Sequence, residues 1–102
     1  MITKATKTRW LNALRSNKYT KGTGSMRNKN CYDAMGVLCD ATGNSKNRNM
    51  SQTYPRLNKN GAVQTFMGLS PSTQERINII NDSTNDFSEV IRYISRNLKV
   101  KS

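Results

Sequence analysis

The stretch CYDAMGVLCDA, residues 31–41, is the densest apolar run before the C-terminal third of this 102-residue chain. Its apolar side chains favour a helix that is buried in the core. Asp33 or Asn30 can serve as the N-cap of this helix, and Gly43 can end it. Gly36 inside the helix costs up to about 1 kcal/mol relative to Ala, so we expect another backbone to pack closely against it.

The sequence before this run predicts a helix over residues 6–17. Thr6 or Thr8 is a suitable N-cap, and Ser16-Asn17 suits the helix end. The apolar residues fall at i, i+1, i+3 and i+4, which is one helical face: Trp10, Leu11, Ala13 and Leu14. We expect Trp10 to belong to the core because it lies on that face.

The C-terminal third carries two helix-start signals. Ser72 followed by Glu75 forms a capping box and predicts a helix with Ser72 as its N-cap. Asp86 followed by Glu89 repeats the pattern and predicts a last helix near residues 87–98. The apolar residues of the last helix share one face, which we expect to pack on the core: Phe87, Val90, Ile91, Ile94 and Leu98.

Residues 19–30 have an extended character and predict a short hairpin. Tyr19-Thr20 favours a strand, Gly22-Thr23-Gly24 allows a turn, and Ser25-Met26-Arg27 can return as the second strand. The hairpin is strongly basic, with cations within it and beside it: Lys18, Lys21, Arg27 and Lys29.

Residues 42–60 form a polar, Asn-rich loop. Two short strands, at 53–54 and 62–66, can pair across the turn at Asn60-Gly61. Together these elements predict a small α+β fold, with about four helices and a short antiparallel hairpin or small sheet. The length suits a single domain over residues 1–102.

The charge of the chain is one-sided. Its 17 basic and 6 acidic side chains give a net charge of +11. Residues 1–60 hold 12 basic and two acidic groups, a net +10, whereas residues 61–102 hold five basic and four acidic groups, a net +1. Such a charge density repels itself, which favours an anionic partner, most commonly nucleic acid. The alternative is a solvated basic face that only aids solubility.

The candidate binding residues gather around the basic hairpin. Backbone amides in a Gly-rich turn, with guanidinium groups nearby, can hold phosphate, and Tyr19 can stack on a base. Arg15 has a second interpretation, because it can instead pair with Asp40 or Asp82 and brace the fold. The predicted site for an anion or nucleic acid comprises Arg9, Arg15, Lys18, Tyr19, Lys21, Arg27, Lys29, Lys46 and Arg48.

Catalytic and metal chemistry find little support in the sequence. The chain has no His, which is the commonest general base and zinc ligand. Cys31 and Cys39 lack two partner ligands for zinc, and we expect Cys39 to be a buried helix residue. Asp33 and Asp40 are a weak signal for Mg²⁺. There is no P-loop and no Gly-x-Ser-x-Gly elbow, so we predict no cofactor, no metal and no enzymatic activity.

The sequence also predicts a cytoplasmic location. No run of about 18 apolar residues is present, so no membrane span is expected. The first residues, Met1 to Lys4, lack the apolar core of a signal peptide. In a reducing compartment the two cysteines should remain thiols.

Three segments resemble a known family. WLNALRS at residues 10–16, with Tyr19 and Gly22, resembles W-x-x-A-L-R-S-G-x-Y-x-Q-G. MGVLCD at 35–40 resembles C-L-G-V-L-C-D, and IIND at 79–82 followed by DFSEVI resembles L-N-D…T-F-x-E-I-A-x-Y-I. These segments are similar to a family of small uncharacterised proteins of tailed bacteriophages and prophages.

The resemblance implies a viral origin, a compact α+β domain and the cytoplasm of an infected bacterial host, but it brings no activity. One departure is informative. The family often has paired cysteines where this chain has Asp33-Ala34. Cysteines that can be replaced in this way are core fillers rather than chemical groups.

Three functional hypotheses follow. The first is a non-enzymatic phage protein that binds nucleic acid or nucleotide phosphates through its basic N-terminal half. The second is a host-takeover or counter-defence protein that binds and inhibits a host protein through an acidic surface of that protein. The third is an enzyme built on Asp33, Asp40 or Cys39, for which no nucleophile–base pair is evident. A homo-oligomer is compatible with all three.

Overall fold

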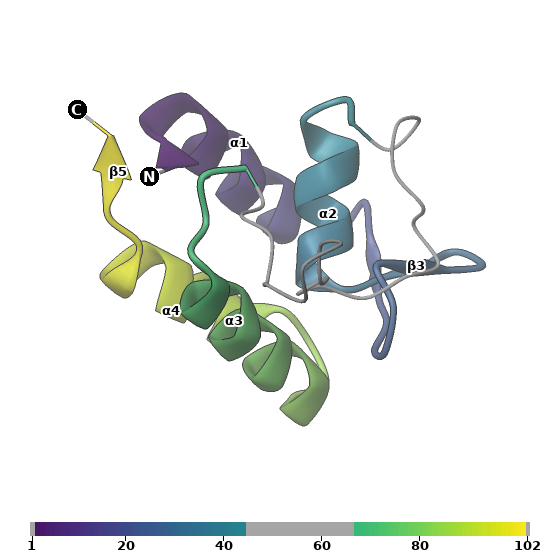
Figure 1. Ribbon diagram of the computed structural model, residues 1–102. Coiled ribbons are helices and arrows are strands. Elements are labelled where there is room, and N and C mark those ends of the chain that lie inside the picture. The colour runs from purple at the N-terminus through teal and green to yellow at the C-terminus, as the bar shows by residue number, and fades with distance from the viewer. Residues whose placement is uncertain (1, 45–66, 102) are drawn as a thin grey trace, which may run out of the picture.

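The computed structural model of the chain describes residues 2–44 and 67–101, and its elements follow one another in a small α+β fold (Figure 1). The polar loop predicted at 42–60 therefore lies almost wholly outside the described residues, as do the strands predicted at 53–54 and 62–66. The elements are β1 (Ile2–Thr3), α1 (Lys4–Arg15), β2 (Thr20–Lys21), β3 (Arg27–Asn28), β4 (Cys31–Tyr32), α2 (Ala34–Ala41), α3 (Pro71–Ser83), α4 (Ser88–Asn97) and β5 (Val100–Lys101).

The four described helices surround one core. α1 packs against α2 and α4, and α3 packs against the same two helices. The two ends of the described chain meet, because β1 pairs in parallel with β5 (Figure 1). Every described helix contributes to the core, whose buried apolar residues are Ile2, Trp10, Leu14, Met26, Ala34, Met35, Val37, Leu38, Cys39, Leu69, Ile77, Phe87, Val90 and Ile94.

The first helix begins earlier than predicted. Its N-cap is Thr3, whose hydroxyl accepts a hydrogen bond from the Thr6 backbone N–H (3.2 Å), so neither Thr6 nor Thr8 is the cap. The predicted end at Ser16 is confirmed. Trp10 is fully buried, as its place on the apolar face predicted.

The central helix α2 confirms two predictions and corrects one. Asp33 is its N-cap, and its carboxylate accepts a hydrogen bond from the Gly36 N–H (2.7 Å). Gly36 is closely packed, since a Cβ added there would lie 1.8 Å from the carbonyl oxygen of Met26. Residues 31–32 are strand β4 rather than helix, because an N-cap residue needs an extended backbone and the chain enters it as a strand.

The C-terminal helices start at caps other than those predicted. Ser70 caps α3, with Pro71 in the first turn, so the box of Ser72 and Glu75 does not form the start. Pro suits this position because its missing N–H needs no partner there.

The N-cap residue of α4 is Phe87, so the predicted cap, Asp86, lies one residue outside the observed cap position. The Asp86 carboxylate nevertheless accepts a hydrogen bond from the Ser88 N–H (2.9 Å). The predicted apolar face of α4 is confirmed, since Phe87, Val90 and Ile94 are buried and the other two residues of that face are half-buried.

The small sheet corrects the predicted hairpin. Its strand order is β2-β4-β3, with β2 parallel and β3 antiparallel to β4. The strands on either side of the Gly-containing turn therefore do not pair with each other. Both pair with β4, and the true hairpin is β3–β4 with the two-residue turn Lys29-Asn30. Residues 22–26 connect β2 to β3, and β4 lies between these two strands.

A buried polar junction joins three helices to this sheet. The indole Nε1 of Trp10 donates to the carbonyl oxygen of Ala34 (2.9 Å). The N–H of Ala34 donates to the side-chain oxygen of Asn81 (3.1 Å), and the Asn81 amide nitrogen donates to the carbonyl of Gly22 (3.0 Å). Buried polar groups left without partners cost about 1–3 kcal/mol each, so these bonds fix how α1, α2 and α3 meet.

The N-cap Asp33 is 3% exposed, and burial raises the pKa of its carboxyl to about 7. The hydrogen bond from Gly36 and the charge of Lys21 lower this pKa, and the nearby charge of Asp82 raises it. Desolvation outweighs the rest because a carboxylate loses most of its hydration here.

The apolar face of α4 can be tested by truncation. Ile94→Ala should lower the free energy of unfolding by about 2–5 kcal/mol, because Ile94 is fully buried. Ile79→Ala is the matched control, since Ile79 is 51% exposed. Urea unfolding measures both, and equal losses for the two variants would show that Ile94 does not belong to the core.

The titration of Asp33 can be tested through stability. Between the ordinary pKa of 3.8 and the folded value of about 7, the folded protein binds the proton more tightly than the unfolded chain does. Stability from this group is therefore full below pH 3.8, is lost as the pH rises to about 7, and is level above it. Asp33→Asn keeps an N-cap acceptor and does not titrate. As the pH rises from 3.8 to about 7, the wild type should lose unfolding free energy relative to this variant. A difference between the two proteins that does not depend on pH would contradict the raised pKa of Asp33.

Candidate functional site

The small sheet places two of the predicted cations on either side of a tyrosine. Lys21 on β2 and Arg27 on β3 are both in register with Tyr32 on β4. Residues in register on neighbouring strands point to the same face of a sheet, so the three form one row with a cation on each side of an aromatic ring. Arg27 is exposed, and Lys21 and Tyr32 are half-buried.

A second tyrosine extends this row. The rings of Tyr19 and Tyr32 have centroids 4.9 Å apart and meet edge to face at 79°. The Nζ of Lys18 lies 5.6 Å from the centroid of Tyr19, and the guanidinium of Arg27 lies 5.6 Å from that of Tyr32. Cation–π contacts of this kind hold the charges on the rings. We call the five residues the cation–tyrosine cluster: Lys18, Tyr19, Lys21, Arg27 and Tyr32.

The cluster is anchored to α2 through Tyr19. The Tyr19 hydroxyl donates a short hydrogen bond to the carboxylate of Asp40 (2.6 Å). Burial of the ring, and then this bond to Asp40, raise the pKa of the Tyr19 phenol above its ordinary value. Asp40 thus has a tyrosine as its hydrogen-bond partner, whereas the sequence offered Arg15 as an alternative partner. Base stacking on Tyr19 stays a prediction.

Lys29 lies at the tip of the β3–β4 hairpin. It is exposed and has a positive φ of 59°, which a lysine rarely adopts. Its carbonyl accepts a hydrogen bond from the Nε of Arg27 (3.0 Å), so the arginine side chain lies back toward the turn. The cation–tyrosine cluster and the hairpin tip together contain five of the predicted site residues: Lys18, Tyr19, Lys21, Arg27 and Lys29.

Arg15 lies apart from the hairpin, beside a hollow of about 420 Å³ that Tyr19 and Lys21 also line. Its guanidinium donates to the Ser95 hydroxyl (3.4 Å). Within residues 2–44 and 67–101 the one ion pair joins Arg92 to Glu89, so the alternative pairing of Arg15 with Asp40 or Asp82 is not formed.

The same hollow also contains an acid. Asp86 lines it, and hydrogen bonds from Ser88 hold the pKa of this carboxyl below its ordinary value. A carboxylate that stays charged opposes the binding of a second anion, so this hollow is a poorer phosphate site than the hairpin.

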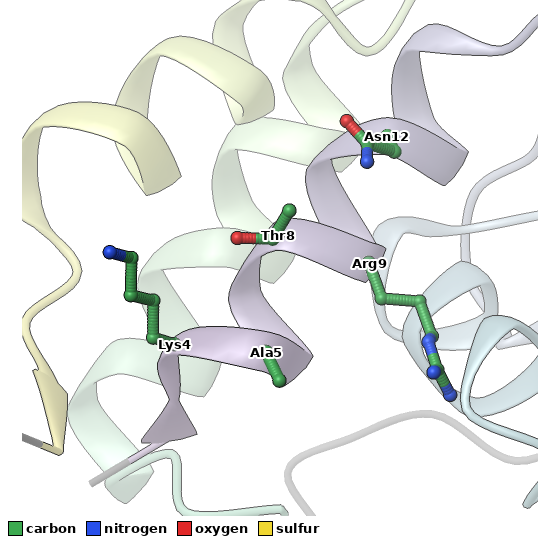
Figure 2. A pocket seen from close by; sticks show the side chains of 5 residues that line it. All are labelled: Lys4, Ala5, Thr8, Arg9 and Asn12. Atoms are coloured by element: carbon green, nitrogen blue, oxygen red, sulfur yellow. The ribbon is translucent and has the colours of Figure 1, made fainter.

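Arg9 lies on a different part of α1. It lines an open hollow of about 720 Å³ on the outer face of that helix, with Lys4, Ala5, Thr8 and Asn12 (Figure 2). Figure 2 shows Lys4 and Arg9 pointing to opposite sides of the helix. No residue of the cluster lines this hollow, so Arg9 does not join the cluster there. Lys46 and Arg48 lie outside the described residues.

The residues considered for catalysis or metal binding have structural roles in the fold. Asp33 caps α2, Asp40 accepts from Tyr19, and Cys39 is buried in the core, as predicted. In the part of the chain that the structure describes, no three Cys, Asp or Glu side chains gather where they could hold a metal ion. None of the described helices combines the length and apolar character needed to cross a membrane.

Tyr32 is the site residue that the sequence interpretation missed. It was assigned to the apolar face of a helix, whereas it lies on β4 between two cations. The signal was the N-cap Asp33 directly after it, because the residue before an N-cap lies outside the helix.

Comparison with known proteins gives one match. The model of a protein family, described as a domain of unknown function (DUF8296), matches residues 2–60. Neither the curated proteins nor the solved structures gave a match to the chain. The match covers α1, the small sheet and α2, and so includes the whole cluster.

The anchor between Tyr19 and Asp40 can be tested with Tyr19→Phe. The change leaves the half-buried carboxylate without its donor and should lower the free energy of unfolding by about 1–3 kcal/mol. Tyr93→Phe is the control, because Tyr93 is also half-buried and no side-chain hydrogen bond to its hydroxyl occurs among the described residues. Alkaline titration of tyrosine absorbance should lose its last-ionising group in Tyr19→Phe alone. If both variants titrate alike, the hydrogen bond to Asp40 is not formed.

Proposed function

The chain belongs to the DUF8296 family, whose function is unknown, and we propose from its geometry that it binds nucleic acid through the basic N-terminal half without catalysing a reaction. The observation that carries this proposal is the cation–tyrosine cluster on the three-stranded sheet. Exposed cations held at fixed positions are the usual means by which proteins contact a phosphate backbone.

The positions of the cations support the proposal. Lys18, Arg27 and Lys29 are exposed, and Lys21 is half-buried in the row between them and the helices. None of these four makes an ion pair within the described ranges. Like charges held this close raise the energy of the protein alone and are neutralised when phosphates bind. Solubility alone does not require cations at fixed positions, whereas two of these cations are restrained by contacts with tyrosine rings.

The resemblance to phage proteins extends the proposal to where the binding takes place. Binding then takes place in the cytoplasm of an infected bacterium, as part of the biology of a tailed phage or prophage. The competing hypothesis is that the same face binds an acidic surface of a host protein and blocks it. The two differ in how strongly binding depends on salt, because only nucleic acid carries a condensed counterion layer.

The test removes the four cations of the hairpin region. Replacing Lys18, Lys21, Arg27 and Lys29 together by Gln should leave the protein folded, because exposed charges contribute little to stability. Affinity for nucleic acid, measured by fluorescence anisotropy, should be lost or sharply weakened. For the wild type, the log of affinity should fall with the log of salt by about 0.7–0.9 per phosphate contact.

The matched control removes the same charge elsewhere. Arg76, Arg92, Arg96 and Lys99 lie on the C-terminal helices or just after them, and all four are exposed. Their replacement by Gln should keep most of the affinity. Equal losses in the two quadruple variants would show that net charge, rather than this face, carries binding. A wild type that binds no nucleic acid at all refutes the proposal, and binding to a host protein with a shallow salt dependence supports the competing hypothesis instead.

A further inference from the structure

A buried carboxyl lies where the strands that carry the cations meet α2. Asp33 is 3% exposed, follows Tyr32 of the cluster directly in the chain, and accepts the hydrogen bond from the Gly36 N–H (2.7 Å). Its own N–H donates to the carbonyl oxygen of Met26 (3.1 Å), the residue directly before Arg27. The carboxyl is therefore fixed one residue beyond the paired ends of β3 and β4.

Lys21 of the cluster acts electrostatically on this carboxyl. Its positive charge lowers the pKa of Asp33, and it also lowers the pKa of Asp86. Among the described residues Lys21 forms no ion pair with either acid, so the attraction acts across a gap rather than through a contact. An anion that binds to the cluster therefore shares this cation with the carboxyl of Asp33.

The elements around Asp33 contribute charges of both signs. Besides Lys21 on β2, the nearby charge of Asp82 in α3 raises the pKa of Asp33. On the sheet side the neighbouring ionisable groups are Arg27 and Tyr32, and from α1 the uncharged indole of Trp10 reaches the start of α2.

Burial is the largest effect on Asp33. It opposes the charged form, because little water can hydrate the carboxylate, and it brings the pKa to about 7. The group therefore changes its protonation near neutral pH. The chain has no His, so Asp33 takes the role that histidine has in most proteins, whose ordinary pKa is about 6.5.

A phosphate bound beside Lys21 changes this balance in one direction. It brings negative charge near Asp33, and it neutralises the cation that favours the carboxylate. Both effects favour the neutral carboxyl. Because coupling between two binding equilibria is reciprocal, a proton on Asp33 strengthens the binding of the phosphate by the same factor.

We propose that nucleic acid binding to the cation–tyrosine cluster drives the uptake of a proton by the Asp33 carboxyl, so that the protein binds more tightly as the medium becomes more acidic. This inference rests on the proposed function and adds a regulator of the same site. The proton comes from the solvent and forms the O–H bond of a neutral carboxyl, and no other covalent bond changes. The neutral carboxyl can still accept the hydrogen bond from Gly36.

The experiment measures the affinity of the full chain for a defined DNA duplex without terminal phosphates, by fluorescence anisotropy at constant ionic strength. If binding raises the pKa of Asp33 by about half a unit, affinity should be about two- to threefold higher near pH 6 than near pH 8. Calorimetric titration at neutral pH, in two buffers with different ionisation enthalpies, should show uptake of about 0.3 proton per complex.

Asp33→Asn tests which group takes the proton. The variant keeps an N-cap acceptor and cannot be charged, so its affinity should no longer depend on pH in this range. It should match the wild type near pH 6 rather than near pH 8. The thiols and the α-amino group are unchanged in this variant, so any pH dependence that remains belongs to them.

Two single substitutions within the cluster test the route independently of any change at Asp33. Lys18→Gln and Lys21→Gln each remove one cation, and both should weaken binding. The charge of Lys21 is the one that acts on Asp33, so Lys21→Gln should also lose most of the pH dependence, whereas Lys18→Gln should retain it. This comparison decides the matter even if Asp33→Asn does not fold.

The outcomes distinguish the inference from the function beneath it. Wild-type affinity that is independent of pH, full pH dependence in Asp33→Asn, or equal pH dependence in the two lysine variants each overturns the proton coupling. Each of these leaves the proposed function standing, provided that the quadruple Gln variant still loses binding. If the wild type does not bind the duplex at any pH in the range, the function and the inference fail together.

Discussion

The backbone of Ala34, through both its N–H and its carbonyl, is the point on which the rest of the structure depends. Its carbonyl takes the indole N–H of Trp10 from α1, and its N–H donates to Asn81 from α3. Asn81 reaches on to the carbonyl of Gly22, where the small sheet ends. The two bonds to Ala34 are buried and the bond to Gly22 is partly buried, so losing any of these partners would leave a polar group poorly satisfied inside the fold.

The same junction positions the surface that carries the proposed function. Asp33, directly before Ala34, caps α2 and receives the chain from β4, while Gly36 one turn later lets the backbone of Met26 approach. The start of a core helix is thereby also the base of an exposed hairpin. The basic tip of the hairpin makes no core contacts itself. Its position is set by the hairpin base, which lies only a few residues away in the best-packed part of the molecule.

The basic face combines charges that repel with contacts that restrain them. Each of the two tyrosines has one cation over its ring. The Tyr19 ring is itself held in place by the hydrogen bond from its hydroxyl to Asp40 in α2. Among the described residues none of the cluster's cations forms an ion pair, although Lys21 lies near enough to Asp33 and Asp86 for its charge to lower the pKa of both carboxyls. An anionic partner gains from this arrangement twice, since the charges are unpaired and their positions are already ordered.

The sequence by itself determined the helical elements, the Asp33 cap of the central helix and the basic character of the N-terminal half. These properties depend on residues close together in the chain: the apolar face of α4, the Asp33 cap and the close contact at Gly36 were all predicted. The N-caps of two helices were predicted two or more residues too late, since the observed caps are Thr3 for α1 and Ser70 for α3. Several hydroxyl residues lie close together at each helix start, and packing selects one of them.

Only the tertiary structure decided how the sheet is paired and which cations meet. Two-residue strands carry too little pattern to specify a partner, so β4 could separate the two strands that the sequence paired with each other. That choice turned Tyr32 from a core residue into the centre of the cation–tyrosine cluster and moved the hairpin tip to Lys29. It also left Arg9 at a different hollow of α1, whereas Arg15 shares a hollow with Tyr19 and Lys21. The direction of an exposed side chain follows from how its helix packs, which no local sequence signal contains.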